Sequence, residues 1–458
     1  MQIKTNSLSA NFSFIPVVTV AIAFMCAGCS KSSSNNPVSS QGAATVQGQL
    51  IGGSGLTTTN HSSKPETAAS LNPPDPVDGE IQGATVTLAQ IQVDGSLKTV
   101  SKAAVKTDAT GHFAVGTDLN DVSNLVAVAV DGASEWQAIV SGQVSTGNTT
   151  DCQPLTNQST VQAEAYSRVV ADGKSNVLTI PDLQLFVSSS VAAGVAGNSG
   201  AIAQLAEAME EESTAQTTAF AQLGVTQSQL STAAIARQQA QIELESALYS
   251  ATGDSSQDAA ALETYTAATI GAYVATAGIP IENVAKAEEI SCSALTSFSA
   301  SMSAGAQFSV AQSAALVRAG LMSEVVLSEL QAGGASQSEV SAANSANTDL
   351  LGSISLAVSP GTIIDAFASY HTAIMAQLEA MAGTAGSALG QVDNDINTAG
   401  GAHATLETTL NSAGTPGAVV QAYMTYYGSI GTMMQGMGGM NNAQLTAATQ
   451  ILMLIDSN

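Results

Sequence analysis

The side chains best suited to acid–base or metal chemistry are few and widely separated in this chain. Its four histidines are His61, His112, His371 and His403. The sequence contains no His-Glu-x-x-His pair, close Cys/His cluster, Gly-x-Ser-x-Gly elbow, phosphate-binding loop or dinucleotide fingerprint. His371 stands beside an apolar helical stripe, where we expect a hydrogen-bonded histidine and not a catalytic one. We therefore predict no enzyme activity, no catalytic residue, no metal site and no cofactor.

Two acidic stretches place carboxylates close together in sequence. Residues 393–397, Asp-Asn-Asp-Ile-Asn, open like a calcium-binding loop, but Thr398 stands where that loop requires glycine and no glutamate closes it. We interpret this stretch as a polar helix junction. The run Glu210, Glu211 and Glu212 is typical of a solvated helix face, since adjacent exposed glutamates need no acid–base role.

A segment near the C-terminus combines methionine with tyrosine at helical spacing. Thioethers bind copper(I), but core packing explains the same spacing because methionine fills irregular gaps. A third interpretation is an adaptable contact surface for a partner protein. The residues of that contact surface would be Tyr423, Met424, Tyr427, Met434 and Met437.

Four cysteines divide into two pairs. Cys152 and Cys292 lie in the body of the chain, and an exported location would permit a disulfide between them. The alternative is two buried free thiols, and the spacing does not decide between these. The other pair, Cys26 and Cys29, lies near the N-terminus directly after an apolar run at 14–25.

That apolar run is too short for a membrane-spanning helix, since a bilayer core of about 30 Å requires about 20 residues, and we interpret it as a cleaved signal. The ending Cys26-Ala27-Gly28-Cys29 resembles a bacterial lipoprotein signal peptide over residues 1–28, although cysteine replaces the usual leucine. The resemblance implies that Cys29 is lipidated. Because Ser30 and not aspartate follows, it also implies placement in the cell envelope at the outer membrane. An ordinary secretory signal cut nearby is the alternative.

Composition excludes some partners. The 458 residues include 11 Lys plus Arg against 36 Asp plus Glu, a formal net charge of −25. Binding to nucleic acid or to anionic lipid headgroups requires clustered cations, which this acidic chain lacks. Hydrophobic residues make up 45% and aromatic residues only 4%, which favours closely packed helices over an extensive sheet.

The chain is expected to contain a lipidated tether, a strand region and a helical region. Residues 29–43 are a polar, flexible tether. Residues 44–152 alternate short strand patterns with turn signals and predict a small antiparallel β-sandwich with a long loop at 52–79. Three stretches, 46–48, 83–88 and 107–115, resemble the carboxypeptidase regulatory-like, prealbumin-like domain. That resemblance implies an accessory or structural module with Phe113 in the sandwich core.

From 157 to 458 the sequence predicts a large, Ala/Ser-rich all-α domain, so the fold class is α+β multidomain. Capping residues recur before first-turn prolines or before glutamine and glutamate, as at Ser336, Ser359, Thr415 and Asn441. Apolar residues follow spacings of three and four. Short connections favour an antiparallel multi-helix bundle, with an elongated helical stack as the alternative.

These features favour a non-enzymatic, lipid-anchored protein of the cell envelope with a structural or protein-interaction role. Its partners would be the membrane, through the N-terminal lipid, and envelope proteins or polysaccharide. The alternative is an extracytoplasmic binding protein that holds an apolar or carbohydrate ligand among its helices, and an unrecognised hydrolase is a third. An exposed apolar patch would favour the interaction protein. An apolar pocket with a few convergent polar groups would favour the binding protein, and a buried carboxylate pair in a cleft would favour the hydrolase.

Overall fold

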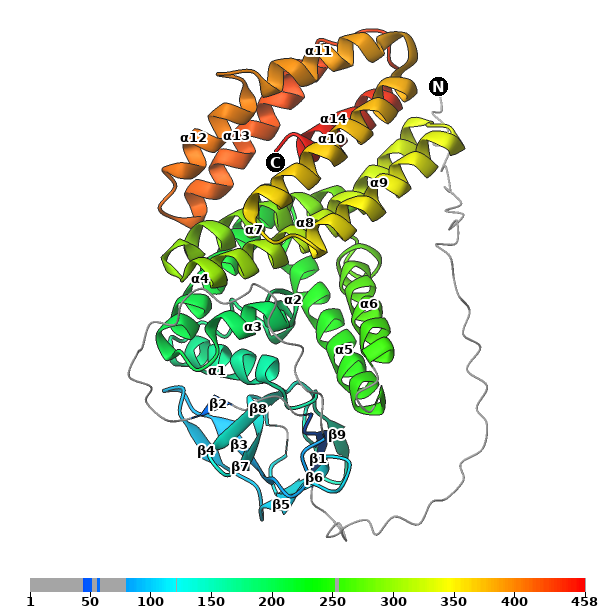
Figure 1. Ribbon diagram of the computed structural model, residues 1–458. Helices are drawn as coiled ribbons and strands as arrows, with labels where there is room; N and C mark the ends of the chain where they lie inside the picture. The colour runs from blue at the N-terminus through cyan, green and yellow to red at the C-terminus, as the bar shows by residue number, and fades with distance from the viewer. Residues whose placement is uncertain (1–43, 52–55, 58–79, 121, 252–254, 458) are drawn as a thin grey trace, which may run out of the picture. The chain divides into compact units, whose positions relative to one another are not determined.

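The computed structural model describes residues 44–51, 56–57, 80–120, 122–251 and 255–457. The predicted signal peptide, the tether with Cys29, and most of the loop at 52–79 lie outside the described residues. All described residues belong to one compact unit that spans residues 39–458. Strands come first in the chain and helices follow, as predicted (Figure 1).

The strands form two sheets that share one apolar core. Their pairings are antiparallel except for that of the first strand with the last, which is parallel and differs from the expected all-antiparallel sandwich. The smaller sheet has the order β6 (His112–Thr117), β1 (Ala44–Gln49), β9 (Thr149–Asp151). The larger has the order β2 (Leu56–Thr57), β8 (Ser134–Val140), β7 (Leu125–Asp131), β3 (Thr85–Ile91), β4 (Leu97–Thr99), with β5 (Val105–Lys106) also on β3.

The turn before β6 shows why this sequence folds as it does. One carboxylate oxygen of Asp108 accepts hydrogen bonds from the backbone N–H groups of Thr110 and His112, at 2.9 and 3.0 Å. Gly111 has φ +71°, and a Cβ there would lie 2.5 Å from the Leu50 carbonyl oxygen. Only glycine fits this position. The turn directs Phe113 into the core, where it is buried as predicted.

The helices occupy the rest of the chain. The predicted caps at Ser336, Ser359, Thr415 and Asn441 each accept a hydrogen bond from the first helical turn, which confirms these starts. The helices are α1 (Asn157–Ala171), α2 (Ile180–Phe186), α3 (Ser189–Val195), α4 (Ser199–Gln222), α5 (Gln227–Ala251), α6 (Ser255–Gly271), α7 (Ile281–Phe298), α8 (Ala304–Gly333), α9 (Gln337–Ser355), α10 (Pro360–Ala382), α11 (Gly386–Asn397), α12 (Ala402–Asn411), α13 (Pro416–Gln435) and α14 (Asn442–Ile455). A π-helical turn, Ala272–Thr276, follows α6, and 3-10 turns follow α7 and α10.

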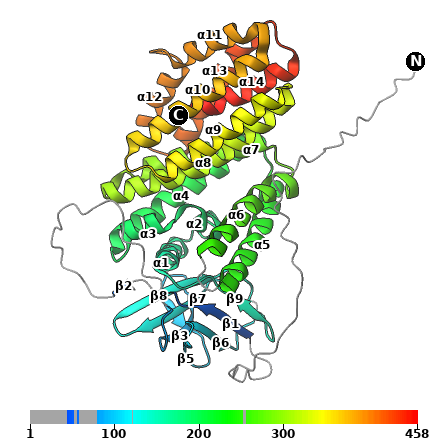
Figure 2. The ribbon, with the colours of Figure 1, turned by 45° about the vertical axis from the view of Figure 1, so that its right-hand side comes forward.

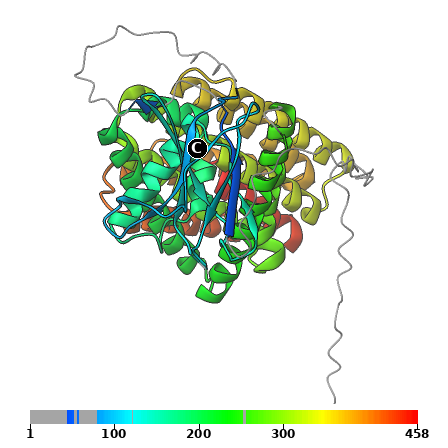
Figure 3. The same cartoon turned by 90° about the horizontal axis from the view of Figure 1, so that it is seen from below.

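The sheet and the helices share packing. Helix α1 lies against the larger sheet, and α5 and α6 run side by side toward the smaller one (Figure 2). Seen from below, the strands lie in front of the helices (Figure 3). Ile91, Val126 and Ile139 of the larger sheet belong to the same apolar cluster as residues of α1 to α4. The larger sheet therefore contributes to two apolar clusters, the one inside the strand region and the one shared with α1 to α4.

Helix α8 is the central helix of the bundle and contacts α7, α9, α10 and α14. It is the one helix among the described residues that is long and apolar enough to cross a membrane. Of its most apolar stretch, 56% is buried inside the protein. Burial of this kind is typical of a core helix.

Candidate functional site

A pocket of about 730 Å³ opens among α7, α8, α10, α11 and α12, beside the end of α14. This volume lies in the range of small-molecule sites, about 300–1,000 Å³. Its walls combine apolar side chains with a few polar ones. The apolar members include Ala314, Ile363, Phe367, Leu410 and Ile455, and the polar members include Arg318, His371, Asp393, Asn397, Glu407 and Asp456.

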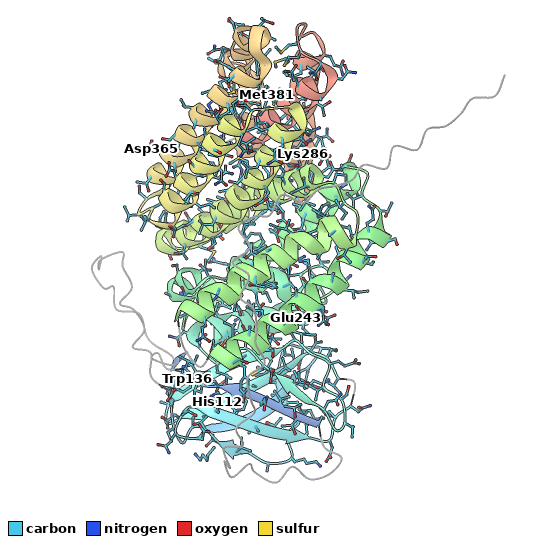
Figure 4. The ribbon with its side chains drawn as sticks, turned by 90° about the vertical axis from the view of Figure 1, so that its right-hand side faces the viewer. His112, Trp136, Glu243, Lys286, Asp365 and Met381 are labelled. Atoms are coloured by element: carbon cyan, nitrogen blue, oxygen red, sulfur yellow. The ribbon has the colours of Figure 1, made fainter. Side chains whose placement is uncertain are left out.

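Helix α10 supplies one whole wall of this pocket. Ile363, Phe367 and His371 follow at intervals of four residues, which aligns them on one helix face. Figure 4 labels Asp365 and Met381 toward the two ends of the helix. Gln312 of α8 holds the connection that precedes α10. Its side-chain amide donates to the carbonyls of Ile354 and Ala357 at 2.8 and 3.2 Å.

At the polar end of the pocket, His371 meets two carboxylates from distant parts of the chain. Its Nε2 lies 2.6 Å from Oδ1 of Asp456, just after α14, and 2.9 Å from Oδ1 of Asp393 on α11. The Asn397 amide, one turn after Asp393, donates to the same two oxygens at 3.2 and 3.1 Å. The predicted hydrogen-bonded role of His371 is confirmed.

His371, Asp393 and Asp456 shift one another's pKa values. Burial disfavours the imidazolium, but the hydrogen bonds to Asp393 and Asp456 outweigh burial and raise the pKa of His371 to about 10. Burial raises the pKa of Asp456 to about 6, although His371 opposes it. Burial also acts on Asp393, but its hydrogen bond to His371 prevails and lowers the pKa of that carboxyl. The three donor atoms lie within 4.8 Å of one another, which is the one such group among the described residues.

On the opposite wall of the pocket, Arg318 of α8 contacts residues from several helices. Its Nη2 donates to Oε1 of Glu289 at 2.8 Å and to the Ser457 hydroxyl at 3.0 Å. The Tyr427 hydroxyl donates to the other Glu289 oxygen at 2.5 Å. The guanidinium also lies over the Phe367 ring, 5.4 Å from its centre. Burial raises the pKa of Glu289 to about 7, although Arg318 opposes it.

The tyrosines and methionines predicted as a contact surface lie mostly inside the bundle. Tyr423, Tyr427 and Met434 of α13 are buried, and Met424 and Met437 are partly buried. The Tyr423 hydroxyl hydrogen bonds with Ser293 of α7. A partner cannot reach the three buried side chains. The prediction of a contact surface is therefore wrong, and core packing explains the spacing of these residues.

The two remaining cysteines are free and buried. Cys152 lies in the core of the sheets and Cys292 in the helical cluster around α7. The disulfide that the sequence permitted is therefore not formed. Burial raises the pKa of both thiols well above its usual range, which disfavours a reactive thiolate.

The expected solvated face at Glu210–Glu212 is also wrong. Glu210 is buried and forms an ion pair with Lys174. Glu212 is wholly buried and lies with Glu288 near the ion pair of Asp182 and Arg237. Burial raises the pKa of Glu212 well above its usual range and that of Glu288 to about 7. These groups link α2, α4, α5 and α7 in the interior, away from the pocket lining.

Among the described residues, the two other histidines do not line the pocket. His112 of β6, labelled in Figure 4, packs edge-on against Tyr249 of α5, with ring centres 5.1 Å apart. His403 lies on α12 without lining the pocket, and His61 is outside the described residues. Sequence reasoning missed the His371 cluster because its members are 22 and 85 residues apart. The polar run at 393–397 was the one signal that pointed to it.

No family model, curated protein or solved structure matches this chain.

Proposed function

We propose that this protein binds a small amphiphilic molecule in the pocket among α7, α8, α10, α11 and α12. The observation that carries the proposal is the cavity of about 730 Å³ whose apolar walls converge on a polar end. Ligand sites are concave, mostly apolar and equipped with a few placed polar groups. Phe367 and Leu410 would contact the apolar body of the ligand, and His371 and Asn397 its polar group.

Exposed apolar side chains around the start of α10 support an apolar ligand. Leu356 and Val358 in the connection between α9 and α10 are 81% and 58% exposed, and Ile364 near the start of α10 is 67% exposed. Ile364 also lines the pocket. Exposed large apolar side chains that gather in a patch mark a surface that meets an apolar partner, and Ile364 is both exposed and part of the cavity lining.

The pocket has the apolar walls and convergent polar groups expected for binding, and it also holds the carboxylate pair Asp393 and Asp456 that would favour hydrolysis. We propose binding because hydrolysis requires a general base paired with a nucleophile, and the hydrogen bonds of His371 among the described residues go to the two carboxylates. Asp456, the carboxyl with the raised pKa, has a wholly buried side chain whose Oδ1 is already hydrogen bonded to His371 and Asn397. The proposed role is therefore non-enzymatic.

The envelope location belongs to the same proposal. The N-terminal pattern that ends at Cys29 supports a lipid anchor, which would place the pocket outside the cytoplasm. The strand region would be a prealbumin-like accessory module, supported by its two sheets with one core and by the turn that precedes the buried Phe113. The shared packing of this module with α1 supports a role in bracing the helices.

The test is extraction of bound molecules from the full-length protein purified from cells, followed by mass spectrometry. A small molecule should be released at about one per chain from wild type. Ala368→Trp fills the pocket from the exposed side of α10 and should abolish the retention. Ala376→Trp is the matched control, since Ala376 is exposed on the same helix and outside the pocket lining. Equal retention in both variants would refute the proposal.

A further inference from the structure

We infer that His371, Asp393 and Asp456 form a binding site for a divalent transition-metal ion, with Zn²⁺ as the preferred ion. One imidazole nitrogen and two carboxylate oxygens converge from α10, α11 and the end of α14. The inference does not rest on the proposed small molecule, because the ion would be held by the protein's own donors.

The convergence of two carboxylates on one nitrogen is the first argument. A single N–H directs its hydrogen at one acceptor, yet both Asp393 and Asp456 approach the same Nε2, at 2.9 and 2.6 Å. A divalent ion serves all three donors at once and compensates both carboxylate charges when the imidazole is neutral. Donors about 2.1 Å from one tetrahedral ion lie about 3.4 Å apart, so a small outward shift of these side chains accommodates it.

The second argument is an unsatisfied atom. Oδ2 of Asp456 is buried and has no hydrogen-bond partner among the described residues. The Asp456 side chain is 0% exposed, and burying such a carboxylate is costly unless a cation compensates it. Without a metal ion, His371 is that cation and contacts Oδ1 alone. A bound ion would displace the proton of His371 and compensate the carboxylate in its place.

The third argument is an open coordination position. All three donor residues line the pocket, and the side chains of His371 and Asp393 are 24% and 17% exposed. Three protein ligands leave the fourth position of a tetrahedral zinc ion open, and a water molecule would fill it. Asn397, which hydrogen bonds to both carboxylates, would orient these ligands from outside.

One imidazole nitrogen and two carboxylate oxygens bind some metal ions more tightly than others. Imidazole suits Zn²⁺ and its first-row neighbours, whereas Ca²⁺ and Mg²⁺ take mostly or only oxygen. We therefore expect Zn²⁺ to bind more tightly than Mn²⁺, and both more tightly than Ca²⁺ or Mg²⁺.

The experiment is calorimetric titration of ZnCl₂ into the full-length protein after chelator treatment, with circular dichroism to verify folding. Wild type should bind one Zn²⁺ per chain. Asp393→Asn should weaken the affinity at least ten-fold, and His371→Ala should remove binding. Asp395→Asn is the control, since Asp395 is exposed on the same helix and loses the same charge.

Asp393 is partly exposed, so Asp393→Asn should stay folded even if His371→Ala does not. Absence of Zn²⁺ binding in the wild type, equal weakening in Asp393→Asn and Asp395→Asn, or a preference for Ca²⁺ would each overturn the inference. The first of these would leave the small-molecule proposal intact, because that proposal is tested by retention in the pocket.

Discussion

Nε2 of His371 lies 2.6 Å from Oδ1 of Asp456, a carboxylate 85 residues later in the chain and wholly buried. Through this contact α10 holds the C-terminal segment that borders the pocket. A buried charge whose partner is removed costs about 3–5 kcal/mol, so the contact matters for the stability of the bundle as well as for the site.

Replacing His371 by alanine should therefore lower the free energy of unfolding by about 3 kcal/mol, measured by urea denaturation with chelator present. Adding Asp456→Asn should recover part of the loss, because it removes the uncompensated charge. His403→Ala, on α12 outside the pocket lining, should change stability by less than about 0.5 kcal/mol. Equal losses in the two histidine variants would show that the His371–Asp456 contact contributes nothing.

Stability should fall as pH rises from about 4.5 to 8, in part through Glu245 of α5. Burial raises the pKa of this carboxyl to about 8, and Ser141 hydrogen bonds to it. In this window the unfolded chain has released the proton that the folded chain keeps, so each pH unit costs up to about 1.4 kcal/mol. Glu245→Gln should flatten this dependence and raise the melting temperature at pH 8 but not at pH 4.5. A variant with the wild-type pH slope would contradict the assignment.

We expect the buried ion pair between Arg237 and Asp182 to affect the free energy of unfolding as well. Both side chains are 5% exposed, and Arg237 also donates to the Tyr273 hydroxyl in the π-helical turn at 2.7 Å. Arg237→Leu should cost about 3–5 kcal/mol in urea unfolding. Arg168→Leu, near the end of α1, removes the same charge from a half-buried position and should cost less than about 1 kcal/mol. Comparable costs in both would refute the importance of the buried pair.

Cys152 and Cys292 should behave as protected free thiols. Alkylating reagent should label neither in the folded protein and both after unfolding in denaturant, because burial disfavours the thiolate of both, including that of Cys292 in the pocket wall. The melting temperature should be the same with and without reductant. A cross-linked peptide pair containing both cysteines, found without reductant, would contradict this account.

Local signals in the sequence predicted the fold well and the site poorly. The cap at Ser359, the stretch 107–115 with its buried Phe113 and the apolar spacings of three and four act within a few residues, and the structure confirms them. The pairing of His371 with Asp456 depends on the tertiary packing of α10, α11 and the end of α14, which no local pattern encodes.

Burial of polar residues was misjudged for a related reason. Glu210 and Glu212 look like a solvated run, but one receives Lys174 from a distant turn and the other faces the interior between α4 and α7. Tyr423 and Tyr427 look like a contact surface, but their hydroxyls satisfy Ser293 and Glu289 inside the bundle. Buried polar groups are recognised only through their partners. The partner of Glu210 is 36 residues away, and those of Tyr423 and Tyr427 are more than 100 residues away.

The most direct test of the ligand-binding account is a crystal structure of the full-length protein purified from the cells that produce it, without added ligand. The account predicts electron density for one small molecule between α8, α10 and α12, with its apolar part against Phe367 and Leu410 and its polar part toward His371. A pocket that contains only ordered water, or one closed by its own side chains, would contradict the central claim.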